Sequence, residues 1–168
     1  PYGCFTTVLR DRDISPDLPG LRSGIRFRAG TQNCMAVACL APAVARERLE
    51  LLLSHQRADG SALDAFFPGS KETPEHGQTR CDNTVWPPMS VHLYCAETGD
   101  LGFLRKELPY VDGGRDTVYG HLMNGLRQIV RDSGNNGLPL LKGRDWDDHL
   151  ALFSEEGAES VMTAQNWC

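Results

Sequence analysis

Three carboxylates surround one indole in the segment Arg144-Asp145-Trp146-Asp147-Asp148. Cleavage of a glycosidic bond needs a carboxylic acid that protonates the leaving oxygen, and an aromatic plane can pack against the apolar face of a sugar. The same residue types also suit a solvated loop whose aspartate caps the next helix. They could instead bind calcium as hard oxygen ligands, although the glycine and trailing glutamate of an EF-hand loop are absent. The spacing alone leaves these three interpretations open.

A second candidate group contains three arginines within seven residues, Arg22, Arg26 and Arg28, followed by Gln32 and Asn33. Guanidinium groups bind phosphate oxygens and sugar hydroxyls through paired hydrogen bonds, so these side chains could form an anion pocket. Surface arginines are also common and usually solvated. The group is therefore a hypothesis that needs support from the rest of the chain.

A third candidate is Asp82, which lies in the run Arg80-Cys81-Asp82-Asn83 ahead of Trp86. Its carboxylate could contact a ligand or could simply cap the helix that follows. The five histidines form no pair at metal-ligand spacing, and the six cysteines form no Cys-x-x-Cys pair. The sequence therefore predicts no metal site and a reduced, cytoplasmic protein.

Charge and hydropathy exclude two classes of partner. The net charge is −5, and the lysines and arginines are scattered among acidic residues, which argues against nucleic-acid binding. The longest apolar run, residues 35–45, has 11 residues and contains Pro42. That is short of the ~20 residues that cross a bilayer, so no membrane span is expected. The first residues show no signal-peptide pattern.

The 168 residues, 40% of them hydrophobic, predict one domain or a piece of one. Residues 1–30 contain two proline turns and predict an irregular lead-in. The long connection 57–82 is rich in Gly, Pro, Ser and charge, a composition typical of functional or disordered loops. The expected helices span residues 31–41, 42–56, 83–98, 100–107 and 116–131, and a last one begins near residue 156.

The strongest helical pattern lies in residues 116–131, where Asp116 is the expected cap. Its expected apolar face comprises Val118, Leu122, Leu126, Ile129 and Val130.

No alternating pattern is long enough for a sheet, so we expect an all-α fold of antiparallel helical hairpins. Because the chain ends inside a helical pattern, an arc of an α/α toroid is favoured over a complete small array.

In order and spacing, several segments resemble the glycoside phosphorylase family of cellobiose, chitobiose and cyclic glucan phosphorylases, with the cellobiose enzymes most similar. The resemblance runs from about Gly24 to the end of the chain. It is carried by Phe27-Arg28, Gln32-Asn33, Ala45-Arg46-Glu47-Arg48, Ala58-Asp59-Gly60-Ser61-Ala62, Asp82 to Trp86, Glu97-Thr98-Gly99-Asp100, Gly137-Leu138-Pro139-Leu140, Asp145-Trp146-Asp147-Asp148 and Glu159-Ser160-Val161.

The resemblance implies an (α/α)6 toroid of six helical hairpins, of which residues 1–168 would form a single partial domain, the N-terminal half of the barrel. An N-terminal β-sandwich domain would precede it. The implied reaction is inverting phosphorolysis of a β-linked glucosyl disaccharide to α-glucose 1-phosphate and a free sugar. The partners would be a small sugar and inorganic phosphate as co-substrate, with no cofactor, and the full-length parent could form a homodimer.

The resemblance also assigns roles to residues. By match to the family pattern Asp-Trp-Asn-Asp, Asp148 would be the general acid and Trp146 a wall of the glucose subsite. Arg28 would hold glucose hydroxyls, and Asn33 and Asp82 would belong to the sugar-binding strip. Phosphate would face an arginine of the stretch from Arg22 to Arg26.

Four positions depart from the family pattern, which usually has carboxylates at Ala29, Asn33 and Asn83 and an asparagine at Asp147. Each lost hydrogen bond to a sugar hydroxyl is worth ~1 to 3 kcal/mol, so altered substrate choice or lost activity is expected.

Two other function classes stay open from the sequence. A hydrolase on a similar toroid would need a second carboxylate ~6.5 to 9.5 Å from Asp148 across the sugar. A non-catalytic carbohydrate-binding module would keep the groove without turnover. In either case we expect the 168 residues alone to turn over nothing.

Overall fold

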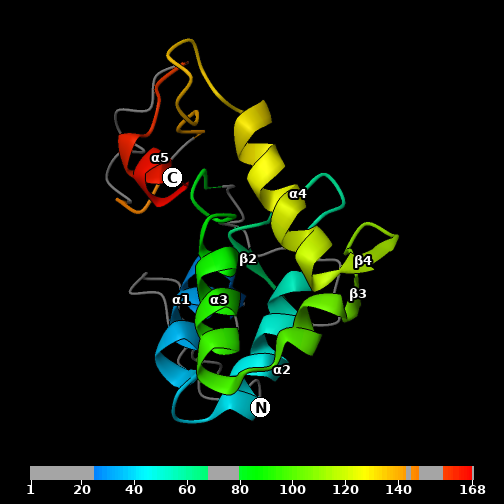
Figure 1. Ribbon diagram of the computed structural model, residues 1–168. Coiled ribbons are helices and arrows are strands. Elements are labelled where there is room, and N and C mark those ends of the chain that lie inside the picture. Colours follow the sequence, from blue (N-terminus) through cyan, green and yellow to red (C-terminus); the bar gives the residue numbers. More distant parts are fainter. Residues whose placement is uncertain (1–24, 68–79, 143–144, 148–156, 168) are drawn as a thin grey trace, which may run out of the picture.

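A computed structural model describes residues 25–67, 80–142, 145–147 and 157–167. Helices dominate these ranges, as expected, and two pairs of short antiparallel strands accompany them (Figure 1). The helices are α1 (Phe27–Val37), α2 (Pro42–Leu53), α3 (Trp86–Thr98), the 3-10 helix η1 (Leu101–Arg105), α4 (Val118–Arg131) and α5 (Val161–Trp167). Strand β1 (Ile25–Arg26) pairs with β2 (Ala65–Phe66), and β3 (Glu107–Pro109) pairs with β4 (Arg115–Thr117).

The strands correct the expectation of a purely helical chain. Each has only two or three residues, which is too short for an alternation of polar and apolar side chains to show in the sequence. Their effect is nevertheless large, because β1 and β2 bring Arg26 opposite Ala65, 39 positions further along the chain.

Helices α1, α2 and α3 pack together around the hydrophobic core (Figure 1). Gly30 allows α1 and α2 to approach closely, since a Cβ at this position would lie 2.9 Å from Cδ2 of Leu52. Between α1 and α3, the buried hydroxyl of Ser90 donates to the carbonyl of Thr31 at 2.7 Å. Fully buried apolar side chains from these and neighbouring elements are Phe27, Ala45, Leu49, Leu52, Leu53, Phe103 and Val118.

Helix α1 begins at Phe27, so the irregular lead-in expected for residues 1–30 is wrong at its described end. The N–H of Phe27 donates to the carbonyl of Asp64 at 2.9 Å, which continues the pairing of β1 with β2. This contact between distant segments sets the start of the helix, and local sequence does not reveal it.

The start of α3 also differs from expectation. The helix begins at Trp86, and its N-cap residue, Val85, makes no side-chain cap bond. Asp82 therefore does not cap this helix, which removes the simplest explanation for its carboxylate. Pro87 and Pro88 occupy the first turn, where a missing N–H removes no helical hydrogen bond.

Helix α4 is capped by Thr117, whose hydroxyl accepts from the N–H of Gly120 at 3.0 Å, so the expected cap at Asp116 is wrong. Val118 and Ile129 are buried as expected, but Val130 is 53% exposed. The buried face instead includes His121, a residue that a search for apolar periodicity does not select.

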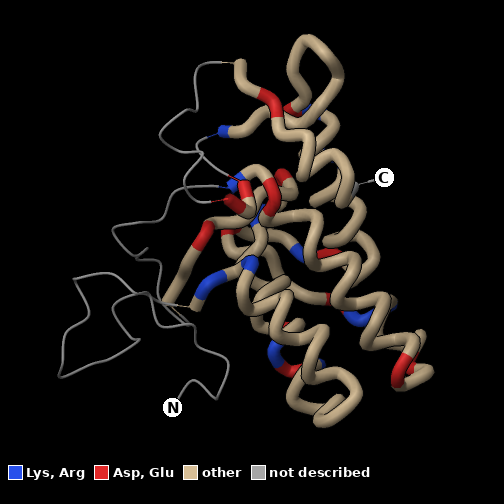
Figure 2. Tube along the Cα trace, turned by 90° about the vertical axis from the view of Figure 1, so that its left-hand side faces the viewer, with Lys and Arg blue, Asp and Glu red and all other residues tan. Residues whose placement is uncertain are grey.

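Local charge pairing follows the sequence. Arg46 donates to Glu50 at 3.0 Å along α2, at the four-residue spacing that places side chains on one face of a helix. Blue and red segments are interspersed along the described trace, with no stripe of one sign (Figure 2). None of the described helices is both long and apolar enough to span a membrane.

Candidate active site

A buried carboxylate, Asp64, joins two arginines next to strand β2. Its Oδ1 accepts from Nε of Arg80 at 2.6 Å, and its Oδ2 forms an ion pair with Nη1 of Arg26. The three side chains are at most 9% exposed. Buried charges are tolerated when they are paired and hydrogen-bonded, so Asp64 stabilises both guanidinium groups inside the protein.

A second, partly buried ion pair lies beside the first, between Arg28 and Asp82. Nη1 of Arg28, in the first turn of α1, donates to Oδ2 of Asp82 at 3.1 Å. The same oxygen accepts from Nε1 of Trp86 at 3.0 Å. Asp82 is 0% exposed, and its Oδ1 accepts no hydrogen bond from the described residues. Asp82 thus orients an arginine of α1 and the first residue of α3.

Arg28 and Arg80, one from each ion pair, both donate to the backbone carbonyl of Asp145. Nη1 of Arg28 donates to it at 2.9 Å and Nη1 of Arg80 at 3.4 Å. The Asp145 carboxylate is buried, and it accepts from the Ser160 hydroxyl at 2.7 Å and from the N–H of Asp147 at 2.8 Å. The neighbouring Trp146 is 57% exposed. The segment is therefore anchored on one side and presents an indole on the other.

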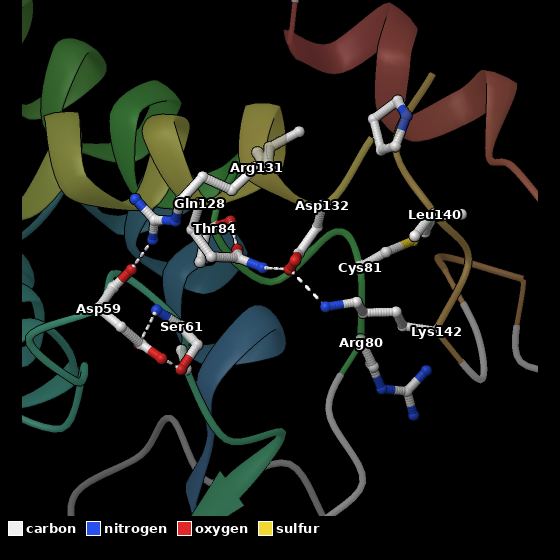
Figure 3. Close-up of a pocket in the computed structure, with 13 residues that line it drawn as sticks. Asp59, Ser61, Arg80, Cys81, Thr84, Gln128, Arg131, Asp132, Leu140 and Lys142 are labelled. Atoms are coloured by element: carbon white, nitrogen blue, oxygen red, sulfur yellow. Dashed lines mark hydrogen bonds and ion pairs between the residues drawn. The ribbon is translucent and has the colours of Figure 1, made fainter. Parts of the chain in front are cut away.

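A cavity of about 300 Å³ lies next to this cluster, between residues 59–62, the C-terminal end of α4 and residues 139–142. In Figure 3, the carboxylate of Asp132 lies between Gln128 and Lys142, and Lys142 Nζ is 2.7 Å from it. Asp59 accepts from the Ser61 hydroxyl at 2.6 Å, a bond that lowers the pKa of Asp59. These acidic groups of the cavity are thus satisfied by neighbouring side chains.

The cavity wall also includes Cys81, whose Sγ lies 3.2 Å from the hydroxyl oxygen of Thr163. Burial raises the pKa of the Cys81 thiol to about 11. The thiol is therefore protonated at neutral pH and is a poor nucleophile, because the thiolate is the reactive form.

The family comparison covers the whole chain. Residues 1–168 match the model of the glycosyl hydrolase 94 superfamily, catalytic domain. The chain belongs to this family. The resemblance found in the sequence is thereby confirmed.

Three of the curated relatives are phosphorylases whose names state different sugars. Solabiose phosphorylase of Paenibacillus borealis is 32% identical over 146 residues, which are 86% of this chain and 18% of that protein. N,N'-diacetylchitobiose phosphorylase of Vibrio furnissii is 31% identical over 186 aligned residues, covering 97% of this chain and 23% of that protein. Cellobionic acid phosphorylase of Neurospora crassa is 23% identical over 143 residues, 84% and 18% respectively. The chain thus spans about a fifth of the length of these relatives.

The structure brings together three of the regions singled out from the sequence. Arg28, Asp82 and the segment 145–147 meet although 54 to 117 positions separate the bonded residues. Asn33 is half-buried on α1. Asp148 and Arg22 lie outside the described residues.

Arg26 is buried, whereas an arginine that binds an anion from solvent would be exposed. It is 8% exposed, and its Nη1 forms the ion pair with Asp64. Its expected role toward phosphate stays a prediction, as do the sugar-binding roles of Arg28, Asn33, Asp82 and Trp146.

Two alternatives for the Asp145 segment, a helix cap and a calcium site, involve Asp148, which lies outside the described residues. The Ser160 hydroxyl accepts from the N–H of Thr163 at 3.0 Å, so a serine caps the start of α5. Within the described ranges, no group of three or more His, Cys, Asp or Glu residues is arranged to hold a metal ion. The Asp145 carboxylate instead has hydrogen-bond donors on both oxygens.

Sequence reasoning missed Asp64 and gave Ser160 no role. Asp64 lies between Leu63 and Ala65 in the first third of the polar connection 57–82, where an aspartate is usually solvated. The available signal was its apolar flanks, which place the side chain at the edge of a buried strand. Ser160 precedes a helical pattern, and Thr163 follows it by the three residues of an N-cap bond.

Proposed function

We propose that this chain is part of an inverting phosphorylase that acts on a β-linked glucosyl disaccharide similar to cellobiose. The observation that carries the proposal is the 2.9 Å bond from Arg28 Nη1 to the Asp145 carbonyl. It fastens the arginine proposed to bind the sugar to the segment that contains Trp146 and runs directly into Asp148. Membership of the glycosyl hydrolase 94 family and the phosphorylase names of the relatives support the reaction class.

In the proposed reaction, an oxygen of phosphate attacks the anomeric carbon from the face opposite the leaving sugar. The glycosidic C–O bond breaks as the new C–O bond forms, and Asp148 gives its proton to the leaving oxygen. The products are α-glucose 1-phosphate and a free sugar. A single carboxyl group is sufficient, because phosphate is already an anionic nucleophile and replaces the base-activated water of an inverting hydrolase.

The residues around the proposed acid have distinct tasks. Trp146 offers an exposed indole as an apolar wall for the glucose ring. Arg28 holds glucose hydroxyls, and its contact with Asp82 sets the direction of its guanidinium. Asn33 extends the sugar-binding strip along α1. The buried Oδ1 of Asp82 would accept from a sugar hydroxyl only after the groups that cover it move.

Arg22 and Arg26 are the proposed phosphate ligands. Nη1 of Arg26 is already paired with Asp64, so a phosphate would have to bind another part of this guanidinium. The carboxylate is shared with Arg80, so the group keeps a net positive charge that favours an anion.

One departure from the family pattern has a structural reason. The amide Nδ2 of Asn83 donates to the carbonyl of Ala62 at 3.1 Å, and Asn83 is 1% exposed. An ionised aspartate at this position would be an acceptor facing an acceptor, without a proton to share. Asn83 therefore serves packing between the 57–67 segment and the start of α3, and it does not reduce sugar binding directly.

We further propose that the chain forms the N-terminal half of an (α/α)6 toroid within a longer cytoplasmic enzyme, which can assemble as a homodimer. The coverage of the relatives supports a longer protein, because the chain spans 18% to 23% of their lengths. The 168 residues alone are expected to turn over nothing.

The test uses the complete polypeptide that contains this chain. It is incubated with cellobiose, with and without inorganic phosphate, and glucose 1-phosphate is measured by an enzyme-coupled assay, with its α configuration read by NMR. Phosphate-dependent formation of the α-phosphate is expected. Sugar release without phosphate would support a hydrolase, and binding without release would support a carbohydrate-binding module. N,N'-diacetylchitobiose and cellobionic acid as parallel substrates test the choice of sugar.

The acid is tested by Asp148→Asn, which should abolish turnover and leave sugar binding largely intact. The matched control is Glu107→Gln, since the Glu107 side chain is 68% exposed on strand β3. If Asp148→Asn retains activity, the proton donor is a different residue.

A further inference from the structure

We propose that Asp145 is a positioning residue for the reaction. It fixes the backbone of residues 145–147, directly before Asp148 in the sequence, by binding this segment to the starts of two helices. This inference rests on the proposed function, because it assigns Asp145 a task that is carried out through Asp148.

The side chain of Asp145 provides the first attachment. Its Oδ2 accepts from the Ser160 hydroxyl at 2.7 Å, and the Ser160 oxygen in turn accepts from the N–H of Thr163 at 3.0 Å. Asp145 and Ser160 are 2% and 3% exposed. Because a hydrogen bond between buried groups has little competition from solvent, this bond holds the segment to the capped start of α5.

The other carboxylate oxygen acts on the backbone. Oδ1 of Asp145 accepts from the N–H of Asp147 at 2.8 Å, the turn that an aspartate forms with the residue two positions on. This bond restricts the orientation of the Asp147 backbone, and Asp147 is the residue before Asp148 in the sequence. A carboxylate at 145 thus controls the residue adjacent to the proposed acid.

The carbonyl of Asp145 provides the second attachment. It accepts from Arg28 and Arg80, and these arginines are oriented by Asp82 and Asp64 respectively. The Asp145 carbonyl is therefore bound by one arginine from each of two ion pairs, Arg28–Asp82 and Arg80–Asp64.

The geometry distinguishes positioning from direct catalysis. Both oxygens of the Asp145 carboxylate are occupied by protein donors and the side chain is buried, whereas Trp146 is 57% exposed. Asp145 therefore acts on the sugar only through its neighbours. A displacement of a reacting group by about 1 Å can reduce a rate about 10²-fold, so such positioning has a large effect.

The experiment compares two substrates in the complete polypeptide with Asp145→Ala. Cellobiose needs a proton on its leaving oxygen, whereas β-glucosyl fluoride releases fluoride with little help from an acid. We expect phosphorolysis of cellobiose to fall about 10²-fold in kcat. The KM for phosphate should change by less than about threefold, and turnover of β-glucosyl fluoride by less than about tenfold. For cellobiose, the decrease of kcat at alkaline pH should also become smaller in Asp145→Ala. The remaining turnover would depend less on a protonated Asp148.

Two milder variants keep the test decisive if Asp145→Ala folds poorly. Asp145→Asn retains an acceptor for the N–H of Asp147 and should recover most of the cellobiose activity. Ser160→Ala removes only the Oδ2 attachment and should show a smaller loss with the same preference for the fluoride. Far-UV circular dichroism and Tm establish that each variant is folded, and Glu107→Gln serves as the exposed control.

The outcomes separate this inference from the proposed function. If the wild-type protein phosphorolyses cellobiose, but both substrates lose equal activity in the Asp145 and Ser160 variants, the positioning role is overturned. The same conclusion follows if neither substrate loses activity. If the wild-type protein shows no phosphorolysis, the proposed function fails, and this inference fails with it.

Discussion

Nε of Arg80 lies 2.6 Å from Oδ1 of Asp64, and both side chains are at most 6% exposed. The same carboxylate is also paired with Arg26, so one aspartate serves two buried guanidinium groups. Because Arg80 in turn contacts the Asp145 carbonyl, this ion pair connects the stability of the fold to the candidate active site.

Replacing this carboxylate is expected to be costly. Asp64→Asn preserves the shape but leaves two buried cations without their shared anion, so the free energy of unfolding should fall by about 3–5 kcal/mol. Urea denaturation monitored by circular dichroism measures the change. The control is Glu107→Gln, which removes the exposed pair with Arg115 (N–O distance 3.8 Å) and should change stability by less than about 0.5 kcal/mol. A loss below about 1 kcal/mol for Asp64→Asn would show that the pair contributes little.

Gly60 should tolerate no side chain, because the backbone of α4 lies against it. Its φ is +91°, and a Cβ would lie 2.1 Å from the carbonyl oxygen of Asn124. Gly60→Ala should therefore lower the free energy of unfolding by about 2–5 kcal/mol, from backbone strain and overpacking together. Gly113→Ala separates the two causes, since Gly113 also has a positive φ, +112°, but no atom within 4 Å of the added Cβ. Equal losses for the two variants would argue against the close contact with α4.

Thr117 should contribute to stability through its cap of α4. Thr117→Ala removes the acceptor of the Gly120 N–H and should lower the free energy of unfolding by about 1 kcal/mol. Thr117→Ser keeps the hydroxyl and should stay within about 0.5 kcal/mol of the wild-type value. Thermal unfolding of both variants measures the difference. A serine variant as unstable as the alanine variant would mean that the hydroxyl is not the cause.

Stability should decline as the pH falls below about 6.5, because the buried His121 and the half-buried His55 resist protonation. Burial lowers the pKa of His121 below its ordinary value of 6.5, against the opposing effects of the Leu108 carbonyl and Asp116. Burial likewise lowers the pKa of His55. The unfolded chain therefore takes up these protons first. Stability from both groups is complete above pH 6.5 and is lost as the pH falls toward their pKa values in the folded state.

The measurement is urea denaturation at pH 7.5, 6.5 and 5.5. His121→Gln should reduce the loss between pH 7.5 and 5.5, whatever its effect on absolute stability. His92→Gln, at an exposed position of α3, should leave the wild-type pH dependence unchanged. A His121→Gln variant with the full wild-type pH dependence would assign the effect to His55 or to other groups.

Several features of the fold followed from local patterns. Pro42 marks the start of α2 because proline is favoured in a first helical turn, and Gly99 ends α3 with a φ of +70°. The Arg46 to Glu50 pair follows from spacing along one helix. The boundaries at Phe27 and Trp86 did not follow, because they depend on strand pairing and on the Asp82 contacts.

By itself, the sequence determined the helical character of the chain, its phosphorylase family and the residue types of the candidate site. These properties depend on local spacing and on motif order. Only the tertiary structure decided that Asp64 pairs with Arg26 and Arg80, that Asp82 orients Arg28, and that Asp145 points inward to Ser160. A buried charge is paired with whichever opposite charge the folded core brings near it. These partners lie 15 to 54 positions apart in the sequence. At such separations, no local sequence pattern indicates which residues are in contact.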